Sequence, residues 1–317
     1  MNKIEKKLKK NLQRSFLSSI IPYIALILIF LFFTSIAPDR FASRTNLLVI
    51  VQQASVIAIV AFGLTFIIIA GSIDLSVSSV VALTGMIAAS VAENNSPTMA
   101  ILAGLLTGML TGLFNGIAFA VLKVPSFVVT LGMLTIARGL TILYSGSQPI
   151  RIFESYEMLG QRPGILIVLG IALLISFILL NLTTFGKYTL AIGGEERVAK
   201  LSGVPITRMK ILLFILAGTF AGLGGIVLSA RVGAATPNAA TGFELNAIAA
   251  VVLGGTPMTG GMGNVTNTVI GALIITSLIN GMVILGIRPE LQLIIQGLVL
   301  IFAVLISIDR KKIGEIK

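Results

Sequence analysis

The sequence predicts an all-α, polytopic membrane protein with about ten transmembrane helices, and three observations support this fold class. First, 56% of the 317 residues are hydrophobic, only 11% are charged, and the mean hydropathy is +1.04, which lies well outside the range of soluble domains. Second, uncharged runs of about 20 residues recur, each long enough as a helix to cross a hydrocarbon core of about 30 Å. Third, segments such as LILIFLFF are apolar on every side, whereas strands of a membrane barrel alternate.

Charged residues divide the chain into ten candidate spans. The spans form one membrane domain, 16–308, between a basic tail, 1–15, and a short tail, 309–317. In chain order they are expected at 16–37, 46–71, 75–92, 99–122, 126–146, 164–183, 211–230, 243–259, 266–286 and 291–308.

The distribution of basic residues predicts the orientation of the chain. The N-terminus has no apolar stretch followed by a small-residue cleavage site, so it is expected to be a cytoplasmic tail. With ten spans both termini are cytoplasmic, and sixteen of the 23 basic residues lie on that side, as the positive-inside rule requires. The net charge of +11 is therefore mainly an orientation signal, and it favours contact with membrane lipid over nucleic-acid binding.

The long uncharged run between Glu244 and Arg288 must hold two of these spans. The segment GGTPMTGGMGN, 254–264, supplies the glycine and proline residues that a turn between them needs.

A weak internal repeat divides the ten spans into two sets of five. TGLFNG, 111–116, resembles TSLING, 276–281, and Asp74-Leu-Ser and Glu244-Leu-Asn each open a span. An odd number of spans in each copy places the second copy upside down, so the sequence predicts an inverted 5+5 repeat of the kind found in transporters.

The longest polar interruption is AIGGEERVAKLSGVPITRMK, 191–210, within an expected cytoplasmic loop at about 187–210. Glu195 and Glu196 suit the first turn of a helix, and Glu196 and Lys200 stand four residues apart, where opposite charges support each other. A helix of about eight residues is marginal alone in water, so its Val198 and Leu201 face is expected to pack against another surface. The alternative is a solvated loop that packs only on its own chain.

Three ionisable residues lie near or within the expected spans, where charges are costly and are often functional. Arg138 is expected about 22 Å beyond Lys123 along its helix. It either reaches outward, alone or to Glu154 or Glu157, or contacts substrate directly. Asp74 is expected to cap the third span, with a gating role as the alternative. Glu244 is expected either to cap a helix at the outer face or to receive a partner protein there.

Several amides and small residues complete the candidate set. Asn115, Asn246 and Asn280 either line a polar path for a hydrated solute or bond one helix to another. Glycines recur every fourth residue, a spacing that permits close helix contact, at Gly104, Gly108, Gly112 and Gly116.

The sequence excludes several chemistries. It contains no cysteine and no histidine, so disulfides and the common zinc and iron ligand sets are absent. No G-x-x-x-x-G-K-[ST] phosphate loop occurs, and no set of nucleophile and base supports an enzyme. We therefore expect no cofactor on this chain, with any ATP and Mg bound by another.

Four ordered segments resemble a known family. They are GSIDLSVSSVVALTGMIAAS from Gly71, FVVTLGMLTIARGLTILYSG from Phe127, AIGGEERVAKLSGV from Ala191 and FELNAIAAVVLGGTPMTGGMG from Phe243. Over roughly residues 45–310 the chain resembles the membrane permease of bacterial ribose-type ATP-binding-cassette (ABC) sugar importers. It departs from the family where Ser72 and Ser78 replace common glycines.

The resemblance implies a non-catalytic permease subunit of the bacterial cytoplasmic membrane. Its partners would be a cytoplasmic ATPase, an extracytoplasmic sugar-binding protein, and a second permease chain that is identical or similar. The sugar stays open among ribose, xylose, galactose and a related signalling molecule. The resemblance places ATPase coupling at Gly194, Glu195, Glu196, Arg197, Lys200, Leu201, Gly203 and Val204. The candidate translocation path or gate comprises Asp74, Asn115, Arg138, Glu244, Asn246 and Asn280.

Two other function classes compete with this interpretation. A secondary carrier for a small polar solute would also have inverted repeats, but it would need a proton or sodium site, for which only Asp74 and Glu244 are candidates. A membrane scaffold without transport would leave the glycine-rich spans and the polar loop unexplained.

Overall fold

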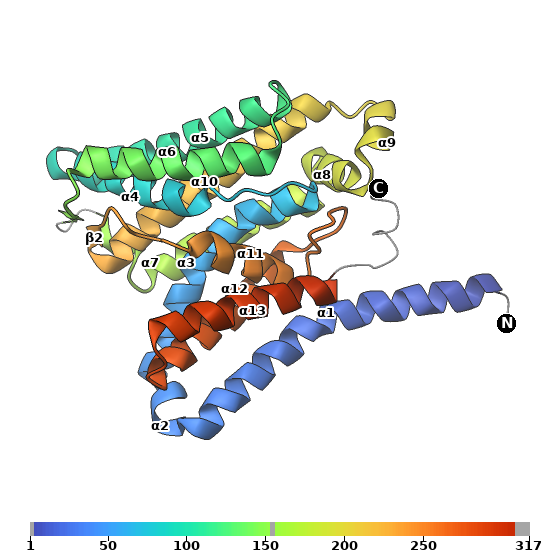
Figure 1. Cartoon of the computed structure of the whole chain (residues 1–317), viewed down its shortest axis with the longest axis horizontal. Coiled ribbons are helices and arrows are strands. Elements are labelled where there is room, and N and C mark those ends of the chain that lie inside the picture. Colours follow the sequence, from blue (N-terminus) through green and yellow to red (C-terminus); the bar gives the residue numbers. More distant parts are fainter. Residues whose placement is uncertain (1–2, 153–155, 308–317) are drawn as a thin grey trace.

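The computed structural model describes residues 3–152 and 156–307, with side chains described for 20–152 and 156–305. The described part is a bundle of helices (Figure 1), seven of which are long and apolar enough to cross a membrane. Three shorter apolar helical segments accompany them, at Ile20–Ile36, Phe243–Leu253 and Pro289–Leu305. The expected class, an all-α polytopic membrane protein, is confirmed at this level.

The elements follow the expected order along the chain. They are α1 (Lys3–Ile36), α2 (Pro38–Phe41), α3 (Arg44–Ile69), α4 (Val77–Asn94), α5 (Pro97–Ala120), α6 (Ser126–Ser145), β1 (Ile150–Arg151), η1 (Glu157–Leu159), α7 (Gly164–Asn181), α8 (Thr184–Gly194), α9 (Glu196–Leu201), α10 (Ile206–Val232), β2 (Ala234–Ala235), α11 (Phe243–Leu253), α12 (Val265–Ile284) and α13 (Pro289–Ser307).

Helices α3 and α10 form the centre of the bundle. Every residue from 54 to 69 of α3 is buried, which explains why that stretch is apolar on all sides. Figure 1 shows α5 and α6 on one flank and α1 and α13 on the other, with α3 and α11 between them. Helices α5, α6 and α7 leave many large apolar side chains exposed, as helices that face lipid do.

The glycine ladder of α5 packs against α10, as its spacing predicts. A Cβ atom added to Gly116 would lie 2.8 Å from the Cα atom of Ile211, and one added to Gly108 would overlap the carbonyl oxygen of Gly218. The two backbones therefore approach more closely than any other residue type would permit.

Two helices occupy the uncharged run 244–288, as expected, but the first is shorter than the predicted span. Helix α11 ends at Leu253 because Gly255 takes a φ of +90° and Pro257 follows, so the chain cannot continue as a helix. The segment 254–264 then forms the turn into α12.

The structure describes most of the predicted N-terminal tail, 1–15, but not the predicted C-terminal tail. Helix α1 already begins at Lys3, so the boundary expected at residue 16 is not a helix end. The predicted tail 309–317 lies outside the described residues.

Helices α4 and α11 each pack against the two helices that follow them in the chain and against one central helix. Helix α4 packs against α5, α6 and α10, whereas α11 packs against α12, α13 and α3. At the end of the bundle opposite α9, β1 pairs with β2 in a two-stranded antiparallel sheet (Figure 1).

Candidate functional site

The polar loop 187–210 folds into α8 and α9, which meet at an extended Glu195. Helix α9 ends just before Gly203, whose φ of +84° reverses the chain towards α10. The expected pairing of Glu196 with Lys200 is wrong, because the carboxylate of Glu196 instead lies 2.8 Å from the ammonium of Lys210. The reversal at Gly203 brings α10 alongside α9 and makes this longer-range contact possible.

Helix α9 holds to the bundle by one face only. Ala199 and the following Val204 are buried, whereas Val198 is 58% exposed and Leu201 is 82% exposed. The apolar face that was expected to pack against another surface therefore finds none among the described residues of its own chain. Both side chains therefore stay exposed on a six-residue helix that is otherwise held to the bundle.

The end of α8 meets two other loops at a glycine junction, formed by Gly71, Gly193, Gly260 and Gly261. The amide of Gly261 donates to the carbonyl of Ile69 at 2.8 Å. A Cβ atom on Gly193 would overlap that same carbonyl oxygen, and one on Gly260 would lie 2.9 Å from the amide nitrogen of Gly71. Gly71, Gly260 and Gly261 all take positive φ angles, which favour glycine.

The glycine junction links three segments of the chain through their backbones. It joins the end of α8 to the loops between α3 and α4 and between α11 and α12. The sequence predicted a turn role for Gly260 and Gly261, within 254–264, and no contact among the four glycines. The repeated Gly-Gly pairs at 193–194 and 260–261 were the available signal, but nothing local indicates that they meet.

Asp74 lies in the loop before α4 and does not occupy the cap position that was expected. The N-cap of α4 is Ser76, and the carboxylate of Asp74 accepts hydrogen bonds from the Ser76 amide at 2.8 Å and from its hydroxyl at 2.6 Å. The side-chain amide of Asn115 donates to that hydroxyl at 3.0 Å. Asp74, Ser76 and Asn115 therefore form a buried chain of hydrogen bonds from the loop to α5.

Burial controls the charge of Asp74. Its desolvation raises the pKa of the carboxyl above the ordinary value of 3.8, while the two hydrogen bonds from Ser76 oppose that rise. The side-chain oxygen of Asn115 is also buried and has no hydrogen-bond partner among the described residues. Polar groups of this kind are costly and are often retained for function.

Arg138 on α6 contacts backbone and not the acidic partners that were expected. Its Nη1 donates to the carbonyl of Pro237 at 2.6 Å and to that of Ala239 at 3.0 Å. Glu154 lies outside the described residues, and Glu157 forms no ion pair there. Arg138 therefore holds the loop between β2 and α11.

Glu244 begins α11 close enough to Arg138 to interact with it electrostatically. The two form no ion pair within the described residues, and the Oε2 atom of Glu244 is buried there without a hydrogen-bond partner. Glu244 thus keeps one acceptor oxygen without a donor, among the described residues, beside the loop that Arg138 holds.

The remaining amides bond helices or stand apart. Asn280 on α12 exchanges two hydrogen bonds of 2.9 Å with Asn46 on α3, which is the helix-to-helix alternative. Asn246 lies half-buried on α11. Within the described residues, no hydrogen bond joins the Asp74, Arg138 and Asn280 groups to one another.

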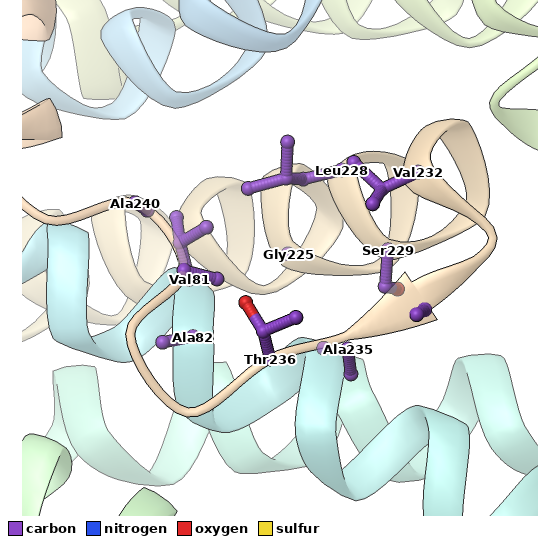
Figure 2. Close-up of a pocket in the computed structure, with 12 residues that line it drawn as sticks. Val81, Ala82, Gly225, Leu228, Ser229, Val232, Ala235, Thr236 and Ala240 are labelled. Atoms are coloured by element: carbon purple, nitrogen blue, oxygen red, sulfur yellow. The ribbon is translucent and has the colours of Figure 1, made fainter. Parts of the chain in front are cut away.

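The loop that Arg138 holds covers a small cavity of about 180 Å³ between α4 and α10 (Figure 2). Val81, Ala82 and Leu228 give it apolar walls, with the hydroxyl of Thr236 on the loop side. An apolar wall does not replace the water lost by a sugar, so this cavity does not suit a sugar.

Comparisons with known proteins identify the family. Residues 46–304 match the family model described as branched-chain amino acid transport system / permease component. The ribose import permease protein RbsC of Bacillus subtilis (strain 168) is 39% identical over 92% of this chain and 92% of its own length. No solved structure matches.

Two relatives from Escherichia coli (strain K12) agree with this match. The probable ABC transporter permease protein YphD is 38% identical over 90% of this chain and 88% of its own length. The L-arabinose transport system permease protein AraH is 38% identical over 86% of this chain and 85% of its own. The chain therefore belongs to the family of transport-system permease components, as an integral membrane permease subunit.

Proposed function

We propose that this chain is the transmembrane permease subunit of an ABC importer, and that it moves ribose or a related monosaccharide across the bacterial cytoplasmic membrane. The observation that carries the proposal is the exposed apolar face of α9, Val198 and Leu201, on a helix that is otherwise fixed to the bundle. A separate ATPase would dock on that face and would bind the ATP and Mg. An extracytoplasmic sugar-binding protein would deliver the substrate.

The sugar assignment is favoured over branched-chain amino acids. The family model carries an amino acid description, but the curated relatives that span about nine-tenths of this chain are named for ribose and arabinose. Similarity over the whole chain is the stronger guide to substrate class.

The packing of the helices supports an inverted 5+5 arrangement of ten spans. If α3 is exchanged with α10, α4 with α11, α5 with α12 and α6 with α13, the partners of α4 become those of α11. That exchange is what a two-fold axis within the membrane plane produces. Both termini would then be cytoplasmic, and a second permease chain, identical or similar, would complete the pore.

The mechanism follows from what α8 and α9 contact. Closure of the ATPase would push on the segment from Gly194 to Val204, including Glu195, Arg197 and Lys200. The glycine junction would pass this movement to the loops before α4 and before α12. At the other end of the bundle, the loop held by Arg138 beside Glu244 would act as the outer gate. Alternating access is then a rocking of helices between these two ends.

Introduction of charge on the exposed apolar face of α9 tests the proposal. The double variant V198D/L201D should no longer co-purify with the ATPase, because it places two carboxylates in an apolar contact. The control is L182D, which places one carboxylate at a side chain that is 69% exposed at the end of α7, outside the α9 face. Retention of the ATPase by V198D/L201D, or loss from both proteins, would contradict the docking assignment.

The expected coupling residues Glu196 and Arg197 give a second test. Alanine at both should uncouple ATP hydrolysis from uptake, whereas a secondary carrier would stay largely active. Alanine at Glu196 also removes its ion pair with Lys210, at 2.8 Å. The single variant R197A keeps that ion pair, so its effect on uptake reports on docking alone.

A secondary carrier remains the alternative function, and one observation favours it. Asp74 is a buried carboxylate without a basic partner among the described residues, which is a plausible proton site. Uptake driven by a gradient and abolished in D74N would support that alternative.

A further inference from the structure

A basic pocket lies between α9 and the loop that joins α5 to α6. It encloses about 350 Å³, and its basic lining residues are Lys123, Lys200 and Lys210. The lining also includes Thr207, in the first turn of α10, and the apolar side chains of Phe119 and Val124. Lys200 and Glu196 also belong to the segment that the ATPase is proposed to push, but the transport steps proposed above assign no ligand to this pocket.

The pocket carries an excess of positive charge. Both carboxylate oxygens of Glu196 contact the ammonium of Lys210, at 2.8 and 2.9 Å, so its one negative charge is already matched. Lys210 is mostly buried and also lies 4.6 Å from the centre of the Phe119 ring. Lys123 and Lys200 form no ion pair within the described residues, so two ammonium groups remain for a ligand.

The surroundings of the pocket are apolar on the side of the membrane. Helix α5 ends at Ala120, and the next two side chains, Val121 and Leu122, are 52% and 68% exposed. Ile117, one turn earlier, is 40% exposed. Charge at the end of a span, beside exposed apolar side chains, is the arrangement that a phospholipid requires.

The pocket and the docking face use different sides of α9. Glu196 and Lys200 stand four residues apart and share one face, whereas Val198 lies about 200° further around the helix from Glu196. An occupant of the pocket therefore leaves Val198 and Leu201 free for the ATPase.

We propose that this pocket binds the phosphate headgroup of an anionic phospholipid. The phosphate lies between Lys123 and Lys200, near the Thr207 hydroxyl and the first-turn amides of α10, where a helix favours negative charge. An acyl chain runs over Val121 and Leu122. The bound lipid bridges α9 to the α5–α6 loop, and this consequence for coupling, unlike the binding itself, rests on the proposed function.

Lipid retention measured on the purified chain by native mass spectrometry tests the binding. The wild type should retain phosphatidylglycerol in preference to phosphatidylcholine. The variant K123Q/K200Q should bind phosphatidylglycerol about 30-fold more weakly, from about 1 kcal/mol for each lysine. The control K187Q/R208Q removes the same charge from exposed residues outside the pocket lining and should bind as the wild type does.

Three results would overturn the proposal. Equal loss in the control would mean that general surface charge attracts the lipid. Displacement of the lipid by millimolar inorganic phosphate would assign the pocket to a free anion. Unchanged lipid binding together with loss of the ATPase in K123Q/K200Q would assign the lysines to an acidic protein surface. Because lipid retention itself is measured on the purified chain without an ATPase, a failure of lipid binding is distinguishable from a failure of the proposed transport function.

Discussion

At the scale of single residues, Asp74 gives the clearest thermodynamic prediction. D74N keeps an acceptor oxygen for the Ser76 amide and cannot ionise in its buried site, so its unfolding temperature at pH 7 should equal or exceed that of the wild type. D74A leaves that amide without its acceptor and should lose about 1–3 kcal/mol of stability. Thermal unfolding of the detergent-solubilised proteins measures both, and equal destabilisation of D74N and D74A would contradict the account.

The carboxyl of Asp74 should also make the stability of the folded protein depend on pH. Its pKa is raised in the folded state, so the stability it contributes is complete below the unfolded value of 3.8 and is lost as the pH rises through the folded value. Relative to D74N, the wild type should therefore become more stable on acidification from pH 7 towards pH 4. A constant difference between the two proteins across this range would show that Asp74 does not titrate there.

Arg138 gives a prediction about the loop between β2 and α11. R138A removes the donor for the carbonyls of Pro237 and Ala239, so hydrogen exchange of 236–242 should become faster. R138K keeps the charge but supplies a less rigid donor, so its exchange rate should lie between those of the wild type and R138A. Exchange in R138A as slow as in the wild type would mean that other contacts hold the loop.

Residue partners were the least predictable feature of this sequence. The expected contacts of Glu196 and Arg138 were chosen among charged residues nearby in sequence, and the structure replaces both with partners on other elements. The acceptors of Arg138 are backbone carbonyls, which every residue carries and which no sequence pattern marks.

At the scale of elements, the glycine junction should be essential for coupling. G193A forces the end of α8 away from the Ile69 carbonyl, so ATP-driven uptake should fall at least tenfold, although the complex still hydrolyses ATP. The control is G170A on α7, because its added Cβ atom has nothing within 4 Å and the residue lies outside both the junction and the segment that the ATPase is proposed to push. Uptake and ATP hydrolysis are measured on the same vesicles.

Two outcomes would contradict this role of the junction. Uptake by G193A equal to that by G170A would show that the contact carries no movement. Failure of G193A to assemble with the ATPase would leave uptake uninformative, so G261A, at another glycine of the junction, provides the second variant. Normal coupling in an assembled G261A complex would likewise remove the junction from the mechanism.

Helices were predictable from this sequence, and their ends were less so. Charge and hydropathy placed an apolar helical segment within every expected span, because an uncharged run in a membrane has few other options. The early end of α11 depends on the φ angle of Gly255, and the continuation of α1 back to Lys3 crosses a polar stretch, where hydropathy carries no signal.

At the scale of the whole molecule, the central claim is that a separate ATPase drives transport through this chain. The family and the exposed face of α9 support it, whereas the buried carboxylate of Asp74 is the feature that a gradient-driven carrier would use. These two sources of energy make opposite predictions for a reconstituted system.

The most direct measurement is uptake of radiolabelled ribose into vesicles that contain this chain, its ATPase and its binding protein. We predict uptake that requires ATP and both partner proteins and that persists when an ionophore collapses all ion gradients. Uptake by this chain alone, driven by a proton or sodium gradient and indifferent to ATP, would contradict the account.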